Sequence, residues 1–97
     1  MTFPTYRISV RTVSTGSVSE DVTAKNIDNL RRNLIESYKG TIIEVSEIRR
    51  VRGKDKGQMP LGILTVSPNG QSASWRMNEG NFYSVDPKNG RLDIRLV

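Results

Sequence analysis

Cysteine and histidine are both absent from this chain of 97 residues. Without thiols there can be no disulfide or thiolate metal site, and without imidazole the usual proton carrier near neutral pH is missing. Any general base would have to be a carboxylate or a lysine with a shifted pKa. The acidic residues are scattered singly, so no pair suggests a two-carboxylate active site or an oxygen-ligand metal cage. We therefore expect neither enzymatic activity nor a bound cofactor or metal.

Long apolar runs and phosphate-cradling loops are also missing. No apolar stretch approaches the roughly 20 residues that cross a bilayer, and the charged start lacks the apolar segment of a secretion signal. Gly53 and Gly57 do not stand between a strand and a helix, as a nucleotide-binding loop requires. These absences predict a cytoplasmic protein with no membrane role.

The length and an apolar content of 35% suit one domain that spans residues 1–97 around a single core. Alternation of apolar and polar residues over 6–11 predicts a first strand, with arginines on its polar side. A turn at 14–17 and the shared parity of Val18, Val22 and Ala24 predict an antiparallel second strand, although Glu20 weakens that assignment.

A helix is predicted over residues 27–39. Asn26 suits the N-cap, Asp28 complements the helix dipole, and Gly40 can end the helix in a left-handed conformation. The outer face is expected to carry Arg31, Arg32 and Lys39. The apolar stripe recurs at steps of three and four and consists of Ile27, Leu30, Leu34, Ile35 and Tyr38.

A strand is predicted over 41–51. Its apolar residues fall at both odd and even positions and so cannot all face one core, and we therefore expect a bulge near Ser46 and Glu47 that resets the alternation. Residues 52–59 predict an exposed loop that ends at Pro60. Two hairpins follow, with strands at 61–66 and 73–77 and then a last hairpin over 82–96.

The fold class that these patterns predict is α+β. We expect a twisted, mostly antiparallel sheet of five to six strands, in the order ββαββββ, packed on one helix. Closure into a partial barrel is the alternative.

The strongest functional signal is the segment 49–56, where five cations and one anion give a net charge of +4 out of +5 for the chain. The cations of such a run repel one another, so the run persists on a folded surface mainly when it is solvated or faces a polyanion. This favours nucleic acid as a partner. The cations that would contact phosphates are Arg49, Arg50, Arg52, Lys54 and Lys56.

A second basic surface is expected on the sheet face opposite the helix. Alternation places five arginines there, namely Arg7, Arg11, Arg76, Arg91 and Arg95. Asp93 and Glu44 would lie among them, so cross-strand pairing could cancel part of the positive field.

Aromatic residues are few, at 6% of the chain, and Tyr6, Trp75 and Tyr38 have the parity of core residues. Rings for base stacking would have to come from Phe3, Phe82 or Tyr83. This favours a duplex or structured nucleic acid that is contacted through its backbone.

Two functions follow from the sequence. The first is a small non-enzymatic protein that binds nucleic acid, DNA or RNA, through the basic segment with little sequence specificity. The alternative is a protein-interaction module, an accessory factor or inhibitor that binds an acidic protein partner or forms a homodimer through a sheet edge.

Overall fold

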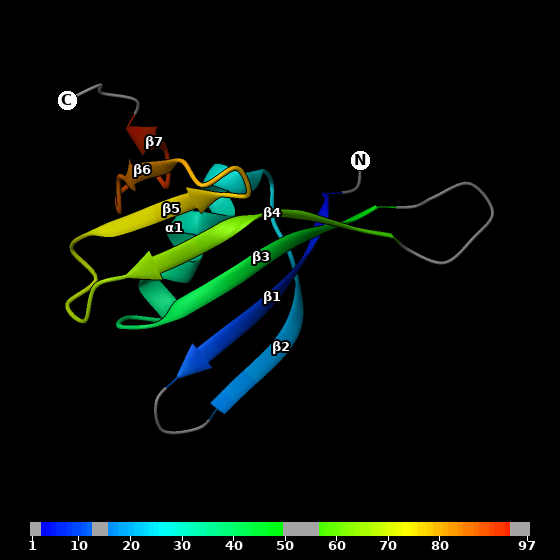
Figure 1. The fold of residues 1–97 in the computed structure, drawn as a ribbon, viewed down its shortest axis with the longest axis horizontal. Helices are drawn as coiled ribbons and strands as arrows, with labels where there is room; N and C mark the ends of the chain where they lie inside the picture. Colours follow the sequence, from blue (N-terminus) through cyan, green and yellow to red (C-terminus); the bar gives the residue numbers. More distant parts are fainter. Residues whose placement is uncertain (1–2, 13–15, 50–56, 94–97) are drawn as a thin grey trace.

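The computed structural model describes residues 3–12, 16–49 and 57–93, and these residues form one helix and seven strands. All neighbouring strands are antiparallel, and they make a single sheet in the order β2-β1-β3-β4-β5-β6-β7, with the helix α1 on one face (Figure 1). The elements are β1 (Thr5–Thr12), β2 (Gly16–Thr23), α1 (Ile27–Ser37), β3 (Ile42–Arg49), β4 (Gly57–Val66), β5 (Ala73–Met77), β6 (Phe82–Val85) and β7 (Leu92–Asp93). The predicted α+β class is thus confirmed.

The expectation of five to six strands is too low. The polar β2 forms in full despite Glu20, and the last hairpin contributes two strands, of which β7 makes only the pairs Ser84↔Asp93 and Val85↔Leu92. The sheet is open, because β2 and β7 form its two opposite edges. The partial barrel is not formed by the described residues.

The helix connects two strands that are not neighbours. Because β2 and β3 both run antiparallel to β1, they are parallel to one another, and α1 crosses between them over one face. From β3 onward the chain is a simple antiparallel meander, in which each strand pairs with the next. No helix formed by the described residues covers the other face of the sheet (Figure 1).

The core lies between α1 and the sheet. The predicted stripe of the helix supplies Leu30, Leu34 and Ile35, and the strand residues that face them share one parity. The buried apolar strand residues are Tyr6, Ile8, Val10, Ile43, Val45, Leu64, Val66, Trp75 and Val85. One expectation for the helix is wrong: Arg31 is not on the outer face but is only 3% exposed.

The predicted ends of α1 are close to those observed. The Asn26 side chain caps the helix by accepting a hydrogen bond from the backbone N–H of Asn29 at 2.8 Å. The helix ends two residues earlier than expected, at Ser37, and the chain then turns at Gly40, whose φ is +70°.

A register shift between β3 and β4 falls at Val45/Ser46, where the sequence predicts a bulge. The inserted residue is on the opposite strand: Val45 pairs with Gly62 and Ser46 with Pro60, so Leu61 is the extra residue. The predicted loop is therefore too long, because β4 already begins at Gly57. Pro60 is tolerated within the strand because it lies at the bulge, where the ladder is interrupted.

Candidate functional site

The face of the sheet without a helix is less basic than the sequence suggests. Arg7 forms an ion pair with Asp21 on β2, and Arg11 forms one with Glu44 on β3, each at 2.8 Å. The hydrogen bond to Asp21 raises the pKa of Arg7 above its ordinary value. Both pairs are exposed, so they add little stability, but they offset the charge of two predicted phosphate-binding residues.

The other predicted arginines lie apart. Arg76 is exposed on β5, where its guanidinium stacks over the Phe82 ring at 5.7 Å. Arg91 is exposed too, but it borders the helix side of the molecule rather than the open face. Arg49 is the last residue of β3. The remaining predicted contacts, Arg50, Arg52, Lys54, Lys56 and Arg95, lie outside the described residues.

A cleft of about 740 Å³ opens between the start of α1, the turn before β7 and the helix-side face of the sheet. Strands β1, β3, β4 and β5 supply its floor, and the residues before and within the first turn of α1 supply one wall. Its main apolar residues are Pro4, Ile27, Met59, Leu61, Met77 and Leu92. Its charged residues are Lys25, Asp28, Arg31, Glu47 and Arg91.

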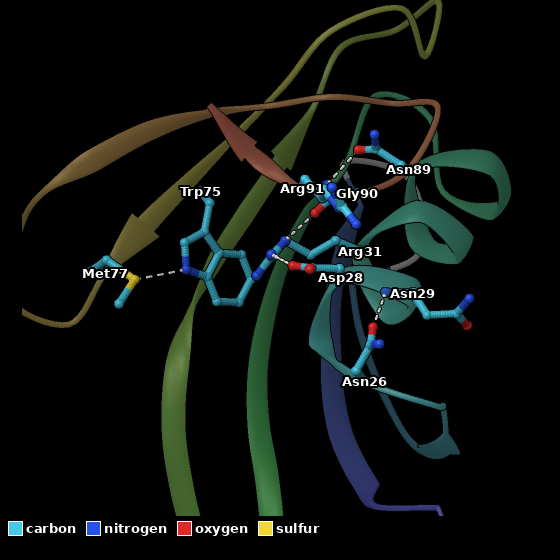
Figure 2. Close-up of polar contacts among 9 residues, drawn as sticks. All are labelled: Asn26, Asp28, Asn29, Arg31, Trp75, Met77, Asn89, Gly90 and Arg91. Carbon is cyan, nitrogen blue, oxygen red and sulfur yellow. Dashed lines mark hydrogen bonds and ion pairs between the residues drawn. The ribbon is translucent and has the colours of Figure 1, made fainter. Parts of the chain in front are cut away.

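Arg31 organises the wall of this cleft. Its Nε donates a hydrogen bond to the Gly90 carbonyl oxygen at 2.7 Å, and its Nη2 pairs with the Asp28 carboxylate one helical turn earlier. The guanidinium lies over the Trp75 ring, 5.0 Å from its centroid (Figure 2). Burial lowers the pKa of Arg31, and the charge of Asp28 opposes that shift. One side chain thus joins α1, β5 and the turn before β7.

Glycine at two positions makes this packing possible. A Cβ at Gly62 would come within 2.6 Å of both the Trp75 ring and the Arg76 carbonyl oxygen, so the indole lies directly against the β4 backbone. A Cβ at Gly90 would overlap the Asp28 carbonyl oxygen and approach the Arg32 nitrogen to 2.8 Å. The turn before β7 therefore touches the α1 backbone itself. Trp75 is held further by its ring N–H, which donates to the Met77 sulfur at 2.9 Å (Figure 2).

Three cations from separate parts of the chain gather at the start of α1. Lys25, Arg32 and Arg91 border a smaller hollow of about 210 Å³, and none of them forms an ion pair within the part of the chain that the structure describes. Asp28 and Glu36 each lie four residues from Arg32 along the helix, but Asp28 pairs with Arg31, and neither carboxylate forms an ion pair with Arg32 among the described residues. We call these three residues the helix-start cations. Local sequence patterns do not predict these three residues as a group, because Arg91 reaches α1 only through the sheet topology.

The Tyr6 phenol on the cleft floor is expected to make the stability of the fold depend on pH. Burial raises the pKa of its phenol, Glu47 raises it further, and Arg31 acts in the opposite direction. Because the folded state holds the proton more tightly, the stability that this group contributes is present below the unfolded pKa of about 10 and is lost as pH rises above it. As pH rises from about 9 to about 11, we expect the free energy of unfolding in urea to fall less for Tyr6→Phe than for the wild type. Parallel pH profiles would contradict this expectation.

Among residues 3–12, 16–49 and 57–93, no three Asp or Glu side chains are grouped so as to hold a metal ion. Within the same ranges, α1 is too short and too polar to span a bilayer. Comparisons with protein-family models, with curated proteins and with solved structures found no match to this chain.

Proposed function

We propose that this chain is a small, non-enzymatic nucleic-acid-binding protein that contacts phosphates with little sequence specificity. The observation that carries the proposal is the group of helix-start cations, which come from three segments and have no ion-pair partner among the described residues. Positive charge that is not neutralised internally is the part of a protein surface that attracts a polyanion. The start of a helix adds a favourable dipole for phosphate.

The basic segment 49–56 supports the same proposal. It joins β3 to β4, and the ends of these strands supply Glu47, Met59 and Leu61 to the cleft that Lys25 and Arg91 also border. The first turn of α1 lies nearer than its last turn to the ends of β3 and β4 that this segment joins (Figure 1). We therefore propose that one phosphate backbone contacts both groups of cations.

The open face is a weaker candidate for phosphate contact. Two of its arginines already have carboxylate partners, so a nucleic acid would have to break or share the pairs Arg7–Asp21 and Arg11–Glu44. We assign the main phosphate contacts to segment 49–56 and to the helix-start cations, with Arg76 as a peripheral contact.

Salt dependence tests this function. If four or five cations displace condensed counterions, duplex affinity should fall with a log–log slope of roughly −4. We expect Lys25→Glu and Lys54→Glu each to flatten the slope by about one. The matched control is Lys39→Glu, which makes the same charge change just after the other end of α1 and should affect binding least. Duplex DNA, single strands and RNA should be compared in fluorescence anisotropy, and a slope near zero for all three would rule the function out.

A second candidate is interaction with protein, including self-association. The observation that favours it is β2, an edge strand of eight residues, all of which except Val22 are exposed. Such an edge offers unpaired backbone groups to another strand. Sedimentation velocity separates the cases: a dimer that is lost when Ser19→Pro is introduced supports pairing through β2, and a monomer at every concentration removes it.

A further inference from the structure

We propose that the cleft beside the start of α1 docks an extended segment of a protein partner, in which an apolar side chain stands next to carboxylates. This proposal goes beyond nucleic-acid binding, because it depends on the apolar floor of the cleft as well as on the charge at its rim. Nucleic-acid binding as proposed above requires only the charge.

The floor has the size and the chemistry of a side-chain pocket. A volume of about 740 Å³ lies within the usual range for ligand clefts, roughly 300 to 1,000 Å³, and such clefts are mostly apolar. Met59, Leu61 and Met77 line it and are only partly buried, so apolar surface remains for a ligand to cover. Methionine is flexible and polarisable, which suits a surface that accepts a branched or an aromatic side chain.

The cleft is poorly suited to an unpaired base. Base recognition usually requires an exposed ring for stacking, but the two rings that line this cleft, Tyr6 and Trp75, are 4% and 2% exposed. Trp75 is covered by Arg31 and by the backbone at Gly62. The apolar surface that the cleft offers is therefore aliphatic and thioether, which favours an amino-acid side chain as its occupant.

The charges around the cleft indicate where an acidic partner would place its carboxylates. The pair Arg31–Asp28 is internally compensated, so Lys25 and Arg91 set the charge of the rim, with Arg32 in the adjoining hollow. The positive end of α1 adds to this field. Glu47 lies on the sheet side of the cleft, in register with Tyr6 and Met59, so we expect the acidic groups of a partner at the rim and its apolar side chain on the floor. An acidic segment would thus lie along the rim and insert its apolar side chain toward Met59 and Met77.

The wall is held in position before binding. Arg31 connects α1 to the Gly90 turn, to Asp28 and to the Trp75 ring, so the groups that flank the cleft come from three elements that are already joined. A preformed cleft loses little conformational entropy when a ligand enters.

Selection of peptides tests the proposal without assuming a partner. A random dodecapeptide library displayed on phage should be panned against the full-length chain, and we expect enriched sequences to share an apolar residue flanked by Asp or Glu. An enriched peptide should then be synthesised with a fluorophore and measured by anisotropy. We expect Met59→Gln and Arg91→Glu each to weaken binding by at least about tenfold and Lys39→Glu to change it less than about twofold. Urea midpoints show whether each variant remains folded.

Failure of this proposal is separable from failure of the proposed function. Nucleic-acid affinity should fall for Lys25→Glu but not for Met59→Gln. If panning enriches no acidic and apolar motif, or if the peptide binds Met59→Gln as well as the wild type, peptide docking in this cleft is excluded and phosphate binding is unaffected. If Met59→Gln weakens nucleic-acid binding instead, the cleft belongs to the nucleic-acid interface and the peptide proposal falls.

Discussion

Replacing Gly90 by alanine is expected to destabilise the fold by about 3 kcal/mol or more, because the new Cβ has no space and the backbone disfavours it. The alanine Cβ would overlap the carbonyl oxygen of Asp28 in α1, and this backbone atom cannot rotate away as a side-chain atom could. In addition, the φ of Gly90 is +74°, a conformation that costs an alanine about 1 kcal/mol or more. Relief of the overlap would separate the turn from α1 and lengthen the hydrogen bond from Arg31 to the Gly90 carbonyl.

Gly80→Ala is the matched control for this prediction. Its φ is +95°, so it imposes a comparable backbone cost, but no described atom lies within 4 Å of the added Cβ. We expect this variant to lose only about 1 kcal/mol. Both are measured by urea denaturation with a common m-value. Equal losses at the two positions would show that the close approach of the turn to the helix does not matter.

Replacing Arg31 by methionine is expected to cost about 2 to 3 kcal/mol, because it removes one side chain that serves three elements at once. Methionine fills much of the volume but leaves the Gly90 carbonyl without its donor and removes the stacking on Trp75. The figure is below that for a fully buried pair, since the Asp28 side chain is 42% exposed and regains water when its partner is lost.

Arg32→Met provides the comparison. Arg32 is the next residue of the same helix, is exposed, and makes no ion pair with the described residues, so we expect a change within about 0.5 kcal/mol. Arg31→Lys adds a second test, because a lysine keeps the charge but lacks the planar fork that reaches Asp28 and Gly90 together. Equal urea midpoints for Arg31→Met and Arg32→Met would contradict the role assigned to Arg31. Recovery of full stability by Arg31→Lys would reduce that role to charge alone.

Local patterns in the sequence predict most of the secondary structure correctly. Alternation at Tyr6, Ile8 and Val10 identifies β1, and the capping chemistry of Asn26 identifies the start of α1. The errors occur where tertiary structure overrides a local rule. Pro60 normally ends a strand, but it lies inside β4 because the extra residue Leu61 bulges beside it.

The candidate site is harder to predict because its residues are joined by topology. Arg31 looks like a surface cation in the sequence, since arginines are rarely buried and nothing nearby identifies its acceptor, the Gly90 carbonyl 59 residues away. Similarly, alternation predicts that Arg91 lies on the open face, but it precedes β7 and borders the cleft instead. Of the two carboxylates that pair with arginines on the open face, Glu44 is anticipated from the sequence, whereas Asp21 is not, because the register between β1 and β2 places it opposite Arg7.

The position of β1 between β2 and β3 has a consequence for how the chain is assembled during translation. Strand β1 leaves the ribosome before both of its neighbours in the sheet, and its second neighbour, β3, is not complete until Arg49 has been synthesised. Until then Tyr6, Ile8 and Val10 of the nascent β1–β2 hairpin are exposed to solvent, and the edge of β1 that later pairs with β3 has no partner strand. The crossover helix emerges in this interval and is the first element able to shield that surface, so its own stability helps to protect the unfinished protein from premature association.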